Sequence, residues 1–201
     1  MLLSLTGCGL GEFFATLGFD THDYEGEAVI EVHETDSDIA LELADMVSIL
    51  TVNSAKIPEF KGTTEGIECC RDAVLNSMYS RNFAKYAGNS ELFKEAMEMY
   101  PQMDFSVLIP ADDFENVAYK YFGGKEKITN ESGEIYEYIE DIDAYITVAK
   151  PVGSTMKITA LTVEETEKTY RMEFETSLEG EKAGKYFALF IKRDDDSLYF
   201  K

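Results

Sequence analysis

The spacing of apolar residues changes once along the chain, from helical to strand-like, and this change constrains the fold more than any other feature. Between residues 36 and 122, apolar side chains recur three and four positions apart, which predicts amphipathic helices. From about residue 134 onwards they alternate with polar ones, as in Tyr-Arg-Met-Glu-Phe at 170–174. Such alternation is typical of an antiparallel sheet with one buried face. Helices followed by strands predict an α+β fold, in which N-terminal helices pack on a C-terminal antiparallel sheet.

Turn and capping residues divide the two halves into elements. Pro110 followed by Ala-Asp-Asp is typical of a helix start, because proline fits the first turn and carboxylates favour the positive end of the helix dipole. Residues 186–191 are apolar throughout, so we expect a central strand covered on both faces. The predicted helices are 36–53, 64–86, 91–100 and 110–122, and the predicted strands are 105–109, 134–139, 144–150, 155–163, 169–176, 186–191 and 198–200.

The composition argues against nucleic-acid binding, disorder of the whole chain and membrane-spanning helices. The chain has 39 acidic and 18 basic residues and a formal net charge of −21, and its basic residues do not cluster. Such a field repels phosphates, so we predict no nucleic-acid partner. A hydrophobic content of 45% is enough for a packed core, which argues against disorder of the whole chain. No charge-free apolar stretch reaches the length of about 18 residues that a membrane-spanning helix needs.

The stretch Leu5-Thr6-Gly7-Cys8 resembles the lipobox of bacterial lipoproteins, in which an aliphatic residue and two small residues precede an invariant cysteine. The resemblance implies that residues 1–7 are a signal-peptide remnant and that Cys8 becomes the acylated N-terminus. Palmitate and related acyl chains on Cys8 would then hold the protein on the extracytoplasmic face of the cell membrane. A signal peptide also has a basic start and an apolar run of about 7 to 15 residues, so we expect the start to be truncated here. The alternative is an apolar start, residues 2–10, that packs on the domain.

Under this interpretation residues 8–35 form a tether or transition segment. Residues 36–201 then form a single α+β domain, with helices over about 37–122 and strands over about 134–201. The order of elements is similar to the cone-shaped folds of the nuclear-transport-factor-2-like and cystatin-like proteins. That likeness implies a pocket between the helices and the sheet.

Residues with obvious chemistry are few. The two histidines, His22 and His33, do not have the i, i+4 spacing of helical metal ligands, and the adjacent cysteines Cys69 and Cys70 fit no zinc pattern. We therefore predict no catalytic residues and no cofactor. We predict no metal site. The run Asp194-Asp195-Asp196 is the best of the weak candidates for calcium, but a solvated turn is the interpretation that we prefer.

Tyrosines give the strand half an aromatic character, and Tyr136, Tyr145 and Tyr170 are the candidates for lining a ligand pocket. The alternative is that tyrosine simply favours strands and bridges the core to water. The function predicted is that of an extracytoplasmic, membrane-anchored lipoprotein whose non-catalytic domain binds a small ligand or an envelope protein. Two alternatives remain open: a pocket enzyme of the cone-fold type that uses acidic and tyrosine side chains, and an assembly subunit that acts through a sheet edge.

Overall fold

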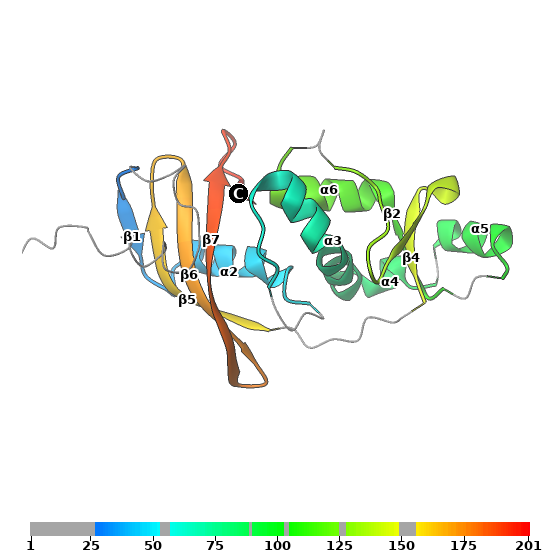
Figure 1. The fold of residues 1–201 in the computed structure, drawn as a ribbon, viewed down its shortest axis with the longest axis horizontal. Helices are drawn as coiled ribbons and strands as arrows, with labels where there is room; N and C mark the ends of the chain where they lie inside the picture. The colour runs from blue at the N-terminus through cyan, green and yellow to red at the C-terminus, as the bar shows by residue number, and fades with distance from the viewer. Residues whose placement is uncertain (1–26, 53–56, 89, 103–104, 125–127, 149–155) are drawn as a thin grey trace, which may run out of the picture.

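The strands of this protein form two separate sheets. The structure, a computed structural model, describes residues 27–52, 57–88, 90–102, 105–124, 128–148 and 156–201. The molecule is elongated, with a five-stranded sheet at one end and a helical part with a three-stranded sheet at the other (Figure 1). The predicted signal-peptide remnant at residues 1–7 and residues 8–26 of the predicted tether (8–35), including Cys8, lie outside the described residues.

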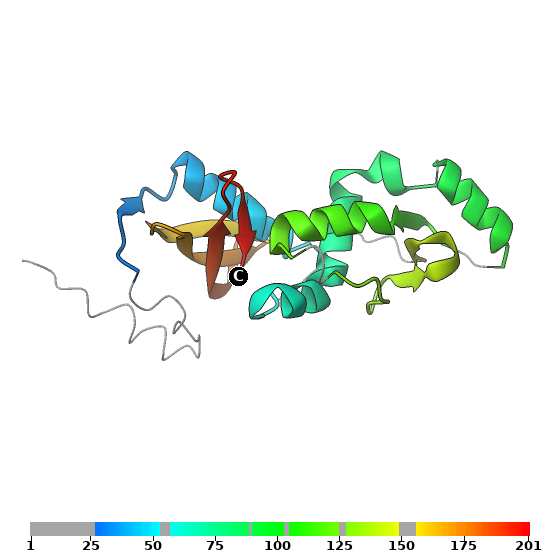
Figure 2. The same cartoon turned by 90° about the horizontal axis from the view of Figure 1, so that it is seen from above.

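The larger sheet is antiparallel throughout, in the order β1-β5-β6-β7-β8. Its strands are β1 (Glu31–His33), β5 (Lys157–Glu165), β6 (Thr169–Leu178), β7 (Glu181–Lys192) and β8 (Leu198–Phe200). The helix α2 (Asp38–Ser48) crosses one face of this sheet (Figure 2). It buries Ala40, Leu43, Met46 and Val47, which recur at helical spacing, and the Ser37 side chain caps its first turn.

A tight hairpin joins β6 to β7. Its two turn residues, Glu179 and Gly180, have φ of 52° and 90°. Positive φ at both central positions matches the right-handed twist of the strands, and glycine adopts it without steric cost.

The other part of the molecule surrounds a smaller sheet, in the order β2-β4-β3. Its strands are β2 (Val107–Pro110), β3 (Glu137–Ile139) and β4 (Ala144–Thr147), with a 3-10 turn at Glu140–Ile142. The long helix α3 (Gly62–Arg81) packs against α6 (Ala111–Phe122). Two shorter helices, α4 (Phe83–Tyr86) and α5 (Glu91–Met99), complete this part. Among the described residues, no helix is long and apolar enough to cross a bilayer.

The α+β class predicted from the sequence is confirmed, and the largest differences from the prediction lie in the strands. Residues 31–33, which we assigned to the transition segment, form β1 at the edge of the larger sheet. The strands form two sheets because β4 does not pair with β5, the next strand along the chain. It pairs instead with β3 and with β2, a strand that precedes α6. The expectation that β7 is covered on both faces is wrong. Phe187, Leu189 and Ile191 on the face opposite Phe190 are only half-buried.

Candidate functional site

A cluster of titratable side chains lies at one end of the larger sheet, on the face that carries α2. Strand register places Glu31 opposite Glu165 across β1 and β5, and Glu165 opposite Tyr170 across β5 and β6. His33, two positions after Glu31, projects from the same face because side chains alternate along a strand. Lys192, near the end of β7, reaches the cluster from the far side of Tyr170. We call Glu31, His33, Glu165, Tyr170 and Lys192 the rim cluster.

The Glu165 carboxylate is the centre of the rim cluster. Its Oε2 lies 2.7 Å from Nε2 of His33, and its Oε1 accepts a hydrogen bond from the ammonium group of Lys192. Lys192 also donates to the carbonyl oxygen of Thr166 at 2.8 Å. The same ammonium group lies 4.5 Å from the centre of the Tyr170 ring, a cation–π arrangement. Because the side chains of His33 and Glu165 are only 15% and 17% exposed, these contacts are partly shielded from solvent.

This environment shifts two acid–base equilibria. Burial alone would raise the pKa of the Glu165 carboxyl, but hydrogen bonds from Lys192 and His33 and the charge of Lys192 outweigh it, so the pKa is lowered. Burial, together with the neighbouring Glu165 carboxylate, raises the pKa of Tyr170 to about 12. At neutral pH the cluster therefore holds a carboxylate and an un-ionised phenol.

The lowered pKa of Glu165 leads to a pH-dependent stability. A carboxyl whose pKa falls on folding stabilises the folded state above about pH 4, and this contribution is lost as the pH falls through the lowered pKa. We expect Glu165→Gln to lower the free energy of unfolding by about 1–2 kcal/mol at neutral pH, since it removes charge-assisted hydrogen bonds. The deficit should shrink as the pH falls below about 4. Urea unfolding of both proteins across this pH range measures it.

The control for this prediction is Glu167→Gln, the same change at an exposed residue within the β5–β6 turn. It should match the parent chain at every pH. A Glu165→Gln deficit that stays constant into strong acid would contradict the assignment of the lowered pKa to Glu165.

The structure does not bring the three predicted pocket tyrosines together. Tyr170 belongs to the rim cluster, whereas Tyr136 and Tyr145 are buried in the other part of the molecule. The Tyr145 ring packs edge-to-face on Phe114, and its hydroxyl donates to Oδ1 of Asn130 at 2.9 Å. Burial raises the pKa of Tyr136, and it raises that of Tyr145 to about 12. Tyr136 and Tyr145 are thus placed as core residues.

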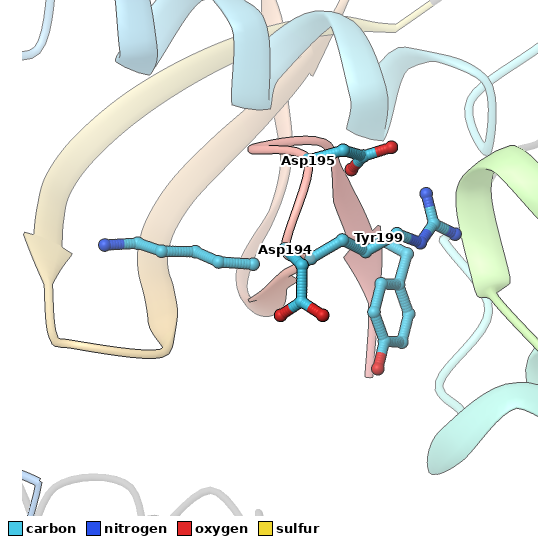
Figure 3. A pocket seen from close by; sticks show the side chains of 5 residues that line it. Asp194, Asp195 and Tyr199 are labelled. Carbon is cyan, nitrogen blue, oxygen red and sulfur yellow. The ribbon is translucent and has the colours of Figure 1, made fainter.

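The three aspartates at 194–196 form the turn between β7 and β8. An open depression there is lined by Lys192, Arg193, Asp194, Asp195 and Tyr199, and Figure 3 shows the Asp194 and Asp195 carboxylates pointing to different sides of the turn. Oδ1 of Asp195 accepts hydrogen bonds from the Ser197 amide at 3.1 Å and the Ser197 hydroxyl at 2.6 Å. These hydrogen bonds lower the pKa of Asp195. Asp195 therefore stabilises the turn, and its carboxylate does not converge with that of Asp194.

The two described cysteines are neighbours on α3, Cys69 exposed and Cys70 buried. Burial raises the pKa of both thiols, and for Cys69 the charges of Glu65 and Glu68 add to the effect. Both side chains are therefore held as thiols, the less nucleophilic form.

The rim cluster was not predicted from the sequence. His33 lacks the i, i+4 spacing of helical metal ligands, but the spacing Glu31-x-His33 puts two side chains on one face of a strand. The partner Glu165 is 132 residues away from His33 and joins it only through strand pairing. Without the register of β1 on β5, no local pattern connects them.

Comparisons with known proteins assign no family to this chain. Neither the protein-family models, nor the curated proteins, nor the solved structures give a match. Because a fold alone does not define an activity, the function has to be argued from the residues.

Proposed function

We propose that this chain is an extracytoplasmic lipoprotein, anchored in the cell membrane through acylated Cys8, whose folded part binds a partner rather than catalysing a reaction. The partner is a small ligand or another envelope protein. The anchor rests on the lipobox-like stretch at residues 5–8, and the net charge of −21 suits a soluble domain held outside the membrane by a tether.

The proposal of a binding role, rather than a catalytic one, rests on the hydrogen bonds and protonation states of the rim cluster. General acid–base catalysis needs a group with a pKa near the working pH that is free to exchange a proton with a substrate. Both oxygens of Glu165 are already engaged, by His33 and by Lys192. Tyr170, with a pKa of about 12, stays protonated at neutral pH. A cluster whose central carboxylate already binds two neighbouring side chains supports recognition better than proton transfer.

The position of the cluster fits such an anchored protein. The described part begins at Glu27, whose carboxylate accepts a hydrogen bond from the Thr166 hydroxyl at 2.6 Å, next to Glu165. Glu27 follows Cys8 by 19 positions. A chain of that length spans at most about 65 Å. The rim cluster therefore lies close to Glu27, where the described part of the chain begins on the side of Cys8.

The anchor is tested by metabolic labelling with palmitate in the organism's own cells, with the protein expressed from its complete gene. We expect the protein to take up label and to fractionate with membranes. Cys8→Ala should lose the label and leave the membrane fraction, because the cysteine thiol is the acceptor of the diacylglyceryl group.

Cys69→Ser is the matched control, since Cys69 is the exposed cysteine of the described part. It should keep both the label and the membrane association. Label that survives in Cys8→Ala, or is lost in Cys69→Ser, would overturn the assignment of Cys8 as the acylated residue.

A further inference from the structure

We propose that Glu31, His33 and Glu165 form a binding site for a divalent transition-metal ion of the Zn²⁺ type. One potential ligand atom from each of the three residues lies within 4.8 Å of the other two. The site joins the edge strand β1 to β5, so the ion would fasten β1 to the rest of the sheet. This inference does not depend on the acylation of Cys8.

The strand register supplies the first argument. Glu31 and Glu165 are directly opposite each other across β1 and β5. Carboxylates at such positions repel each other and destabilise the pair, unless positive charge lies between them. Of the two carboxylates, Lys192 pairs with that of Glu165, so one negative charge of the pair remains uncompensated when the imidazole is neutral. A divalent cation bound by both carboxylates removes this repulsion.

The interatomic distances supply the second argument. Nε2 of His33 and Oε2 of Glu165 are 2.7 Å apart. Two donors bound to one ion at about 2.1 Å in tetrahedral geometry lie about 3.4 Å apart, so the ion needs both side chains to move apart by less than about 1 Å. Oε1 of Glu31 lies 3.6 Å from the other ring nitrogen, Nδ1. The Glu31 side chain is 63% exposed, so it has room to rotate towards Nε2. The same exposure leaves an entry path for the ion.

The donor set selects the class of ion. One imidazole and two carboxylates suit Zn²⁺ and related borderline ions, whereas Ca²⁺ prefers six or more oxygen ligands. Lys192 would remain on the second oxygen of Glu165, where it is also held by the Thr166 carbonyl oxygen. Such an outer partner orients a ligating carboxylate and balances part of its charge.

A protonated imidazole held between the two carboxylates is the competing explanation. The two explanations are separated by titrating the full chain with Zn²⁺ in a calorimeter, with Cys8 and Cys69 replaced by serine so that these thiols do not compete for the ion. We expect one Zn²⁺ per chain near neutral pH. His33→Gln and Glu31→Gln should each weaken binding by at least about tenfold. Ca²⁺ should bind far more weakly than Zn²⁺.

Matched controls are His22→Gln, at the only other histidine of the chain, and Glu34→Gln, an exposed glutamate just after β1. Both should bind Zn²⁺ like the parent. Because Glu31 is exposed, Glu31→Gln tests the site without risk to the core. Absence of Zn²⁺ binding up to millimolar ion, equal binding in the Glu31 and His33 variants and the parent, or an equal loss in His22→Gln, would each overturn the proposal.

Discussion

Replacing Phe200 by alanine should lower the free energy of unfolding by about 3–5 kcal/mol, the usual cost of removing a buried aromatic ring. Phe200 lies on β8 and is only 3% exposed. Its ring centre is 5.2 Å from that of Phe190 in the larger sheet and 5.7 Å from that of Phe122 at the end of α6. The ring therefore packs between the two parts of the elongated molecule, and its loss leaves a cavity where they meet.

Two further rings contact Phe200 from the helical part, Phe60 at 6.1 Å and Tyr121 at 6.4 Å between centres. Chemical denaturation followed by circular dichroism measures the effect. The control is Phe83→Ala, the same change at a ring that is 58% exposed, and it should cost much less. A loss in Phe200→Ala no larger than in the control would contradict the role of this ring in joining the two parts.

Local patterns account for most of the helices and strands. The Pro110 start predicted the helix that the structure has at Ala111–Phe122, and the alternation at 170–174 lies within β6. These elements were predictable because their signals come from neighbouring residues. The predicted helix at 64–86 is interrupted at Asn82, which has φ of −135° and ψ of 46°. The sequence did not predict this interruption, because the position holds neither proline nor glycine.

Strand pairing was the part that local patterns could not predict. The hydrophobic period assigns residues 144–147 to a strand, but it does not say whether they pair with 107–110 or with 157–165. That choice depends on which helices cover which sheet, and it decided the division into two sheets. The rim cluster depends on strand pairing in the same way. The strand β1 has only three residues, and two of them are titratable, so its sequence shows no apolar alternation that would predict a strand. Tyrosine content is a weak guide to a pocket for a different reason, since tyrosines in strands reflect strand propensity and core packing as much as binding.

Asp72→Ala is expected to lower the free energy of unfolding by about 2–4 kcal/mol, because one carboxylate holds three backbone amides. From α3, the Asp72 side chain accepts hydrogen bonds from the N–H groups of Glu134 (2.7 Å), Ile135 (3.0 Å) and Tyr136 (3.3 Å). These bonds fix the segment that leads into β3 and positions the buried ring of Tyr136. Without the carboxylate, the three amides lose their acceptor. Thermal and urea unfolding measure the loss.

Gly133 gives an independent test of the same contact. A Cβ atom at this position would lie 2.3 Å from Oδ1 of Asp72, so Gly133→Ala should displace the carboxylate and destabilise the fold without removing any polar atom. In the Asp72→Ala background, Gly133→Ala should cost much less, because the clash and the hydrogen bonds are lost together. Glu68→Ala, at an exposed carboxylate on the same helix, is the control for charge removal and helix propensity. Additive losses in the double variant would show that Gly133 is required for another reason than its approach to Asp72.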